Sequence, residues 1–137
     1  MPRGKSASLA DGWRITVTGV IPDATAIVLA ENRFNDPPEP GRQFFMVRIS
    51  ATYTGDGSDV LSSYRFRLLG ASAVARSSRF KNSCGVTPNV LTYREVVSGD
   101  TIRGNLCWQV PVFDVGTLVM FDDEPFEKAQ RVWFALG

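Results

Sequence analysis

Short segments in which apolar and polar residues alternate recur along the whole chain. A period of two indicates β-strands with one face toward a core, and the β-branched residues that are common in these segments favour strands. The pattern and the β-branched content predict strands at residues 13–20, 24–30, 42–54, 63–69, 71–76, 90–97, 101–111, 117–121 and 131–136.

Two of these segments predict most of the core. Segment 101–111 follows a turn at 98–100 and ends at Pro111, because proline cannot donate a hydrogen bond to a sheet. One face of segment 42–54 carries Phe45, Val47, Ile49, Ala51 and Tyr53. The apolar face of segment 101–111 carries Ile102, Gly104, Leu106, Trp108 and Val110. Its opposite face carries Arg103, Asn105, Cys107 and Gln109.

Turn and loop signals separate the predicted strands. Three prolines within residues 37–40 prevent sheet pairing in a loop at 31–41, and glycine and aspartate mark a turn at 55–59. Residues 122–125 have the acidic side chains and the proline that are typical of a helix start, so we expect a single helical turn ending by residue 130.

These elements predict an all-β fold, an antiparallel β-sandwich or barrel of seven to nine strands. A length of 137 residues suits one domain, which we place at 12–137, and an apolar content of 44% is enough for a core. Residues 1–11 are small, polar and basic, and we expect them to form a flexible lead-in.

The charge of the chain is balanced overall but unevenly distributed. The net charge of +1 gives no overall attraction to nucleic acid or membranes, and no apolar run reaches the roughly 18–20 residues of a membrane span. Residues 60–94 carry six basic and no acidic side chains, whereas residues 95–137 carry three basic and seven acidic ones. The middle section is therefore expected to form a basic face if its strands are neighbours.

The sequence contains no histidine, which excludes catalytic systems and zinc sites that need an imidazole. A glycosidase needs only two carboxylates, but the acidic residues of this chain lie mostly in predicted turns, where solvated carboxylates are common. We therefore expect neither enzyme activity nor a cofactor nor a metal site.

Three blocks of the sequence carry a family resemblance: DGWRITV at 11–17, PGRQFFMVRI at 40–49 and SGDTIRGNLCWQVP at 98–111. Together they resemble the immunoglobulin-like domain of bacterial surface lipoproteins, a domain of unknown function, and they are loosely similar to small secreted mycobacterial antigens. The chain departs from the family at Thr54-Gly55, where an asparagine is usual, and at Trp108, where a phenylalanine is common. The resemblance implies an immunoglobulin-like β-sandwich, export and a surface location, without a catalytic motif.

The chain has two cysteines, Cys84 in a polar segment and Cys107 on a predicted strand. Together with the resemblance, their number favours one disulfide in an exported protein. The first residues lack the apolar stretch of a signal peptide, so the chain is expected to be the mature part of such a protein. Two free thiols in an intracellular protein are the alternative, and metal binding by the pair is not expected without Cys-x-x-Cys spacing.

Basic side chains of the middle section form the candidate site. In segment 63–69, Tyr64 and Phe66 are predicted to face inward, and Arg65 and Arg67 outward. Guanidinium groups bind carboxylates and phosphates, so an anionic sugar, polymer or phosphate group is the expected partner, with ordinary solvent-facing charge as the alternative. Nucleic acid is not expected, because the nearby aromatic residues are predicted to face inward. The candidate anion- or partner-binding residues are Arg65, Arg67, Arg76, Arg79 and Lys81.

Two other groups have a weaker pattern. Calcium ligands are available at 122–124 and Glu127, but without the alternating spacing of a calcium loop, so a solvated helix start is favoured. Trp13, Trp108 and Trp133 are candidates for stacking on a carbohydrate, with Trp108 expected in the core and Trp133 the best candidate for exposure.

These observations predict a non-catalytic extracellular or cell-envelope domain that binds or presents a partner, a surface polymer or a protein, at the bacterial surface. The alternative is a structural spacer domain of a lipoprotein that has no ligand of its own.

Overall fold

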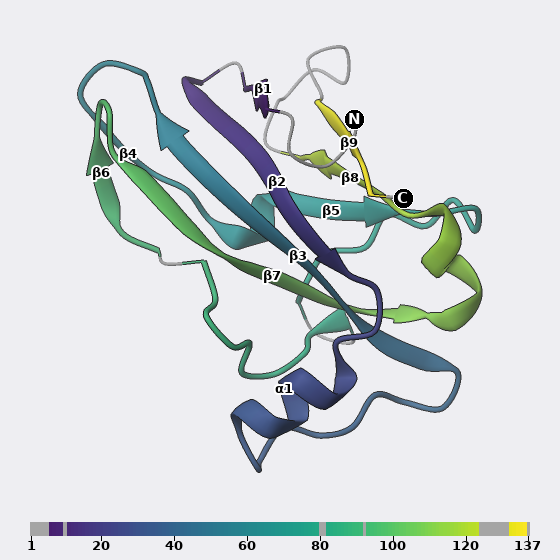
Figure 1. Cartoon of the computed structure of the whole chain (residues 1–137). Coiled ribbons are helices and arrows are strands. Elements are labelled where there is room, and N and C mark those ends of the chain that lie inside the picture. Colours follow the sequence, from purple (N-terminus) through teal and green to yellow (C-terminus); the bar gives the residue numbers. More distant parts are fainter. Residues whose placement is uncertain (1–5, 10, 80–81, 92, 124–131, 137) are drawn as a thin grey trace.

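The computed structural model describes residues 6–9, 11–79, 82–91, 93–123 and 132–136. In this part of the chain, nine strands form three antiparallel sheets: a large sheet in the order β1-β2-β3-β7, a small sheet in the order β5-β8-β9, and the pair β4-β6 (Figure 1). The strands are β1 (Ser6–Ser8), β2 (Trp13–Ile21), β3 (Arg42–Tyr53), β4 (Ser58–Val60), β5 (Phe66–Leu69), β6 (Glu95–Val97), β7 (Thr101–Pro111), β8 (Val119–Asp122) and β9 (Trp133–Ala135). The described helical segments are α1 (Thr25–Glu31), η1 (Ser63–Arg65) and η3 (Val112–Thr117).

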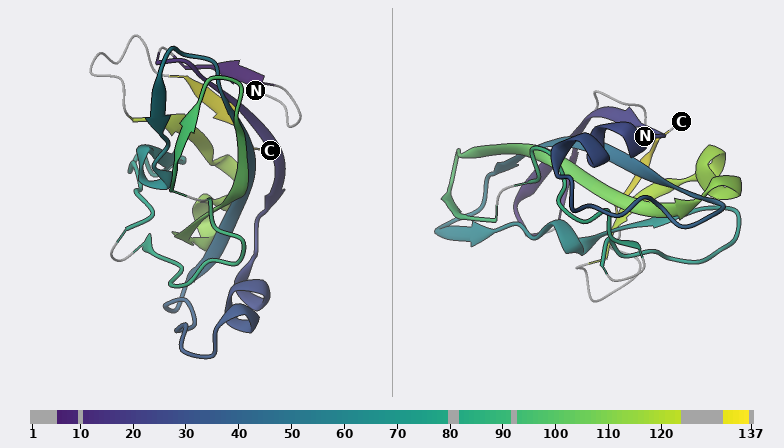
Figure 2. Two further views of the ribbon diagram at one scale, coloured as in Figure 1. Left: turned by 90° about the vertical axis from the view of Figure 1, so that its left-hand side faces the viewer. Right: turned by 90° about the horizontal axis from the view of Figure 1, so that it is seen from below.

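The large and small sheets lie face to face and form a β-sandwich, with the two layers visible from below (Figure 2). Trp13, Phe45 and Trp108 of the large sheet share one buried cluster with Phe66 and Phe134 of the small sheet. Every residue predicted for the core face of segment 42–54 is buried, which confirms that prediction. The apolar face of segment 101–111 is confirmed in the same way at Ile102, Leu106, Trp108 and Val110.

The longest pairing in the sheets joins β3 to β7. It runs without a break from Arg42 opposite Pro111 to Thr52 opposite Thr101. This register aligns the two core faces, because Phe45 lies opposite Trp108 and the alternation then keeps the following apolar residues in step.

The opposite side of the large sheet is also buried at one end. Phe44 and Met46 of β3 form a second apolar cluster with Cys107 of β7, and Val28 of α1 packs on them. At this end, β3 and β7 are therefore covered on both faces, by the small sheet and by α1.

Residues 24–30 were predicted as a strand, and this prediction is wrong, because Thr25–Glu31 form helix α1. The β-branched Ile27 and Val28 suggested a strand, but only Val28 is buried in the helix, whereas Ile27 is 41% exposed. A helical turn brings Ala24 and Val28 onto one face, and together they cover the apolar end of β3. The N–H of Ala24 donates to the carbonyl oxygen of Phe44 over 2.7 Å, which fixes the start of the helix on that strand.

Several other predicted strands are shorter than expected. Only Glu95–Val97 of segment 90–97 form a strand, and only Arg76 of segment 71–76 pairs, through a single bridge to Leu68. Segment 117–121 begins within η3, so β8 starts at Val119. Asp122 belongs to β8, and Asp123 is not helical, so no helix starts at these two residues. Residues 124–130 of the predicted turn lie outside the described part of the chain.

The lead-in predicted over residues 1–11 is partly structured. Ser6–Ser8 form β1, which pairs with β2 along the edge of the large sheet, and Leu9 is buried in the main core. The hydrophobic pattern did not predict this strand, because its residues are small and mostly polar and an edge strand buries little apolar surface of its own.

Candidate functional site

Arg65 was predicted to face outward, but it is buried, with 9% of its surface exposed. The one-turn helix η1 breaks the alternation of segment 63–69, and the hydroxyl of Ser62 accepts a hydrogen bond from the N–H of Tyr64 over 3.2 Å at its start. As a result, Tyr64 faces solvent and the guanidinium of Arg65 turns inward onto two carboxylates, Asp122 and Asp11. Both predicted orientations are therefore corrected, and Arg65 is not available to an external anion.

Two other arginines of the predicted site are also paired with carboxylates. Nε of Arg67 lies 2.9 Å from Oδ2 of Asp123, and Nη2 of Arg76 lies 3.4 Å from Oδ2 of Asp114. These carboxylates come from the acidic last section of the chain, which β8 brings beside the basic middle section by pairing with β5. The middle section therefore loses much of its positive charge to its neighbour in the fold, and the predicted basic face does not form at these three residues.

Of the two remaining predicted residues, Lys81 lies outside the described residues. The guanidinium carbon of Arg79 lies 4.1 Å from the centre of the Tyr64 ring, above its face. Among the residues that the structure describes, Arg79 makes no ion pair. The described arginines of the predicted site are therefore of two kinds: three form ion pairs with carboxylates, whereas Arg79 is exposed and stacks on a tyrosine ring.

The structure also bears on the two other candidate sites, the calcium site at the acidic turn and the carbohydrate site of the tryptophans. Asp122 and Asp123 form ion pairs with arginines, and the described residues contain no group of three side chains that could hold a metal ion. The other two predicted calcium ligands, Glu124 and Glu127, lie outside the described residues. Trp13 and Trp108 are fully buried, so the three tryptophans form no carbohydrate platform. Trp133 is 45% exposed, as predicted, and its ring packs against Phe121.

A different basic surface lies on the polar face of the large sheet. This polar face continues the side that α1 covers at the other end, and alternation places on it the residues Ser6, Ser8, Arg14, Thr16, Thr18, Arg48, Ser50, Thr52, Thr101, Arg103 and Asn105. None of these positions carries a carboxylate. Arg14, Arg48 and Arg103 are exposed and make no ion pair within the described part of the chain.

The polar face is hollowed between Arg48 and Arg103. The hollow has a volume of about 390 Å³, and its wall includes Thr18, Asn89 and Asn105. Arg48 lies directly opposite Asn105, and Arg103 comes two residues before Asn105 on β7, so Arg48 and Arg103 occupy diagonal positions on neighbouring strands. Thr18 is the extra residue of a bulge between Val17 and Gly19, which turns it toward this hollow.

Hydroxyl groups between the arginines are ordered by cross-strand hydrogen bonds. The hydroxyls of Thr52 and Thr101 lie 2.7 Å apart, and those of Ser6 and Thr16 lie 2.5 Å apart. Each such pair keeps donor and acceptor capacity for a ligand. Chemically, the polar face can hold an anion at its arginines and hydroxyl-bearing groups between them.

The sequence contained a signal for this surface that the prediction did not use. The polar positions of segments 13–20, 42–54 and 101–111 are all hydroxyl, amide or guanidinium groups beside Arg14, Arg48 and Arg103. Only the strand order shows that the three segments are neighbours, because the residues come from distant parts of the chain.

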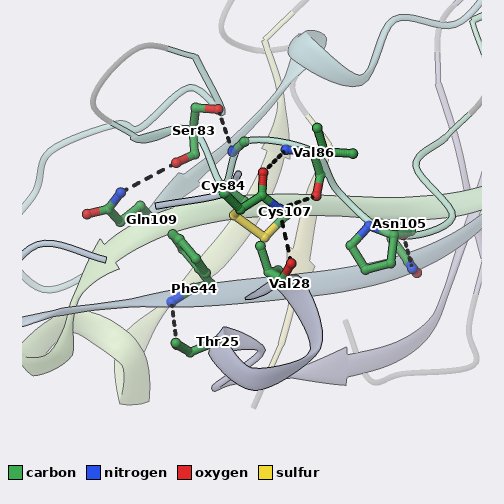
Figure 3. The surroundings of a disulfide bond; sticks show 12 residues. Thr25, Val28, Phe44, Ser83, Cys84, Val86, Asn105, Cys107 and Gln109 are labelled. Carbon is green, nitrogen blue, oxygen red and sulfur yellow. Dashed lines mark hydrogen bonds between the residues drawn. A yellow bond between two sulfur atoms is a disulfide. The ribbon is translucent and has the colours of Figure 1, made fainter. Parts of the chain in front are cut away.

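The predicted disulfide is present between Cys84 and Cys107, which are 23 residues apart in the sequence (Figure 3). Both cysteines are buried beside Val28 and Phe44, under α1. Gln109 reinforces the link, because its side-chain amide donates to the carbonyl oxygen of Ser83 over 3.4 Å. The disulfide thus fixes the polar segment that contains Cys84 onto β7. The described part of the chain has no free cysteine.

A smaller hollow of about 220 Å³ lies beside the disulfide. Its wall combines hydroxyl groups of Ser63, Ser78 and Thr87 with Tyr64 and the disulfide itself. It shares Ser63 and Tyr64 with a cleft that also contains Arg79, so these two depressions adjoin each other.

No family model matches the chain, and no curated protein matches its sequence. Solved structures do match. The "putative lipoprotein" YcdA of Bacillus subtilis aligns with a TM-score of 0.62 at 14% identity and covers 98% of this chain, which spans 38% of the length of that protein. The secreted protein MPT63 of Mycobacterium tuberculosis aligns with a TM-score of 0.64 at 13% identity, covering 90% of this chain and 88% of its own.

The YjhA protein of Bacillus subtilis aligns over 98% of both chains, with a TM-score of 0.61 and 12% identity. Identities this low are informative about the fold alone. Within the described residues, no helix is both long and apolar enough to cross a membrane. The chain therefore has an immunoglobulin-like β-sandwich fold, which it shares with a secreted protein and a "putative lipoprotein" of bacteria.

Proposed function

We propose that this protein is a non-catalytic domain, secreted or anchored outside the bacterial cell, that binds an anionic polymer of the cell envelope through the polar face of its large sheet. Two observations support the location. Proteins of the same fold include a secreted protein, and the buried disulfide suits an oxidising compartment.

The observation that carries the binding proposal is the charge of the polar face. Arg14, Arg48 and Arg103 are exposed on one sheet surface without a carboxylate among its positions, whereas Arg65, Arg67 and Arg76 are paired. Exposed guanidinium groups form two parallel hydrogen bonds with carboxylates or phosphates, so an unpaired set on one sheet face favours a ligand with repeated negative charges.

The spacing of the arginines also suits an extended chain. Arg48 and Arg103 occupy diagonal positions, which places their Cβ atoms about 7–8 Å apart. Arg14 lies opposite Thr52, four residues along β3 from Arg48, which corresponds to about 14 Å. A linear polymer with a charge on each repeat can reach all three groups, and the hydroxyls between them can bind sugar or polyol oxygens.

The same face disfavours single-stranded nucleic acid. Proteins that bind single strands combine cations with exposed aromatic rings on which the bases stack. The polar face carries arginine, hydroxyl and amide side chains, and none of its positions is aromatic.

The test measures binding of purified poly(glycerol phosphate) by isothermal titration calorimetry. We expect Arg48→Gln with Arg103→Gln to weaken binding at least tenfold, because both exposed charges are lost without disturbing the core. Arg33→Gln with Arg94→Gln is the matched control, since both side chains are exposed and neither belongs to the polar face. The control is expected to bind within twofold of the wild type.

Ionic strength gives a second measurement. Binding between exposed charges is screened by salt, so the affinity is expected to fall as NaCl is raised from 50 to 500 mM, where the Debye length shortens to about 4–5 Å. Equal affinities of the wild type and the double variant would contradict the proposal. Absence of any binding by the wild type would favour the spacer role instead.

A further inference from the structure

A cleft separate from the polar face is formed by Ser62, Ser63, Tyr64, Arg79 and Tyr93. Its volume is about 400 Å³, within the range of roughly 300–1,000 Å³ that is usual for small-molecule sites. Tyr64 is 47% exposed and Tyr93 is 73% exposed, so both aromatic rings are open to solvent.

The cleft is held in place by local structure. The turn η1, capped by Ser62, is what directs Tyr64 outward. The guanidinium carbon of Arg79 lies 4.1 Å from the centre of the Tyr64 ring, and the backbone N–H of Arg79 donates to the hydroxyl of Ser77 over 3.0 Å. This stacking orients the guanidinium in advance, so less side-chain entropy is lost when a ligand binds.

The polar groups of the cleft have free capacity. Unlike Arg65, Arg67 and Arg76, Arg79 meets no carboxylate among the described residues, and the Ser63 hydroxyl makes no hydrogen bond to them. The cleft therefore presents one cation, several hydroxyl groups and aromatic surface within a single depression.

From this combination we infer that the cleft binds a sugar ring that carries a carboxylate, a uronic acid residue. The exposed ring of Tyr93 offers a flat apolar surface for the C–H face of a pyranose. The guanidinium of Arg79 matches the two oxygens of the carboxylate, and the hydroxyls of Ser63 and the tyrosines can bind the ring hydroxyls.

The adjoining hollow beside the disulfide extends the same argument. It shares Ser63 and Tyr64 with the cleft and continues with the hydroxyls of Ser78 and Thr87. A neighbouring sugar of the same oligosaccharide can therefore occupy it, with hydroxyl contacts and no further charge. The inference does not rest on the polar face, because Arg79 is not among the residues of that face.

The experiment compares methyl β-D-glucuronoside with methyl β-D-glucoside, which differ at the carboxylate alone, by titration followed in amide NMR spectra. The wild type is expected to bind the glucuronoside at least tenfold more tightly. Arg79→Gln is expected to abolish this preference, and Tyr93→Ala to weaken binding of the glucuronoside at least fivefold. Both side chains are exposed, so neither change is expected to affect folding.

Two controls keep the outcomes separate. Arg33 stacks on the exposed Phe34 at 4.8 Å, so Arg33→Gln removes a similar arginine–aromatic pair from another part of the surface and should leave binding unchanged. Phe34→Ala, which removes the exposed ring of the same pair, should likewise leave glucuronoside binding unchanged. The inference is overturned if the wild type binds the two glycosides equally or binds neither, or if Arg79→Gln keeps the preference.

Discussion

Arg65 and Asp122 form a buried ion pair held by two parallel hydrogen bonds. Nε of Arg65 lies 2.7 Å from Oδ1 of Asp122, and Nη2 lies 2.8 Å from Oδ2. On its other side, Nη1 lies 2.9 Å from Oδ2 of Asp11. Burial alone lowers the pKa of Arg65, but the hydrogen bonds to Asp122 and then to Asp11 outweigh it and raise that pKa above its ordinary value. The cluster links η1, β8 and the turn before β2.

Removing one partner of this pair should be costly. We expect Arg65→Met to lower the free energy of unfolding by about 3–5 kcal/mol, because Asp122 is then buried without its counter-charge. Urea denaturation followed by tryptophan fluorescence measures this change. Arg67→Met is the matched control: its ion pair with Asp123 is partly exposed, so a loss of about 1 kcal/mol or less is expected. Similar decreases in the free energy of unfolding for the two variants would show that the buried pair contributes no more to stability than the exposed pair.

Asp114 should make stability depend on pH in the acid range. Burial raises the pKa of its carboxyl, but hydrogen bonds from the hydroxyl and N–H of Ser72 and from Arg76 outweigh burial and hold the pKa below its ordinary 3.8. The resulting stabilisation is complete above the ordinary pKa and is lost as the pH falls through the lowered one.

The corresponding variant is Asp114→Asn, measured by urea denaturation between pH 6 and pH 2. The wild type is expected to be more stable at pH 6, and this advantage should shrink as the pH falls below about 4. Asp36→Asn, at an exposed carboxylate, should follow the wild-type profile throughout. An advantage that stays constant down to pH 2 would contradict the role assigned to Asp114.

Gly104 permits a close approach between backbones. A Cβ atom at this position would lie 2.3 Å from Cα of Leu91, where residues 89–91 run beside the free edge of β7 and exchange hydrogen bonds with Asn105. Gly104→Ala should therefore destabilise the protein by about 1–3 kcal/mol through forced displacement of that segment. Gly116→Ala, which has open space around it, should be close to neutral. A thermal denaturation series compares them, and equal melting temperatures would refute this explanation.

The disulfide should supply a large part of the stability. Closing a loop of this length corresponds to about 3 kcal/mol in the chain-entropy description, for a separation of 23 residues between Cys84 and Cys107. Cys84→Ala with Cys107→Ala is expected to lose about that amount. Intact mass after alkylation of the denatured, unreduced protein should show no label. Two labels on material made under oxidising conditions would show that the bond does not form.

Local alternation was sufficient to predict which residues face the core in the long strands. Phe45 and Trp108 could be assigned inward, and Trp133 outward, because the side chains of a strand alternate whatever its partner is. The pairing of Cys84 with Cys107 could be predicted from the presence of two cysteines only together with the family resemblance, because two free thiols were the alternative.

The candidate site could be predicted much less well, as Arg65 and Arg79 illustrate. Both lie in the same basic section, yet one is buried against two carboxylates and the other is open on a tyrosine ring. The difference follows from one turn of helix at η1 and from the position of β8, which neither alternation nor composition encodes.

Periodicity and residue type along short segments therefore predict the all-β class and the core faces of β3 and β7, whereas the cysteine pair also depended on the family resemblance. Three features appear only in the folded chain: the helix at Thr25–Glu31, the burial of Arg65, and the common face of Arg14, Arg48 and Arg103. The physical reason is that burial and charge pairing are set by neighbours in space, and those neighbours come from distant segments whose order in the sheets is a property of the whole fold.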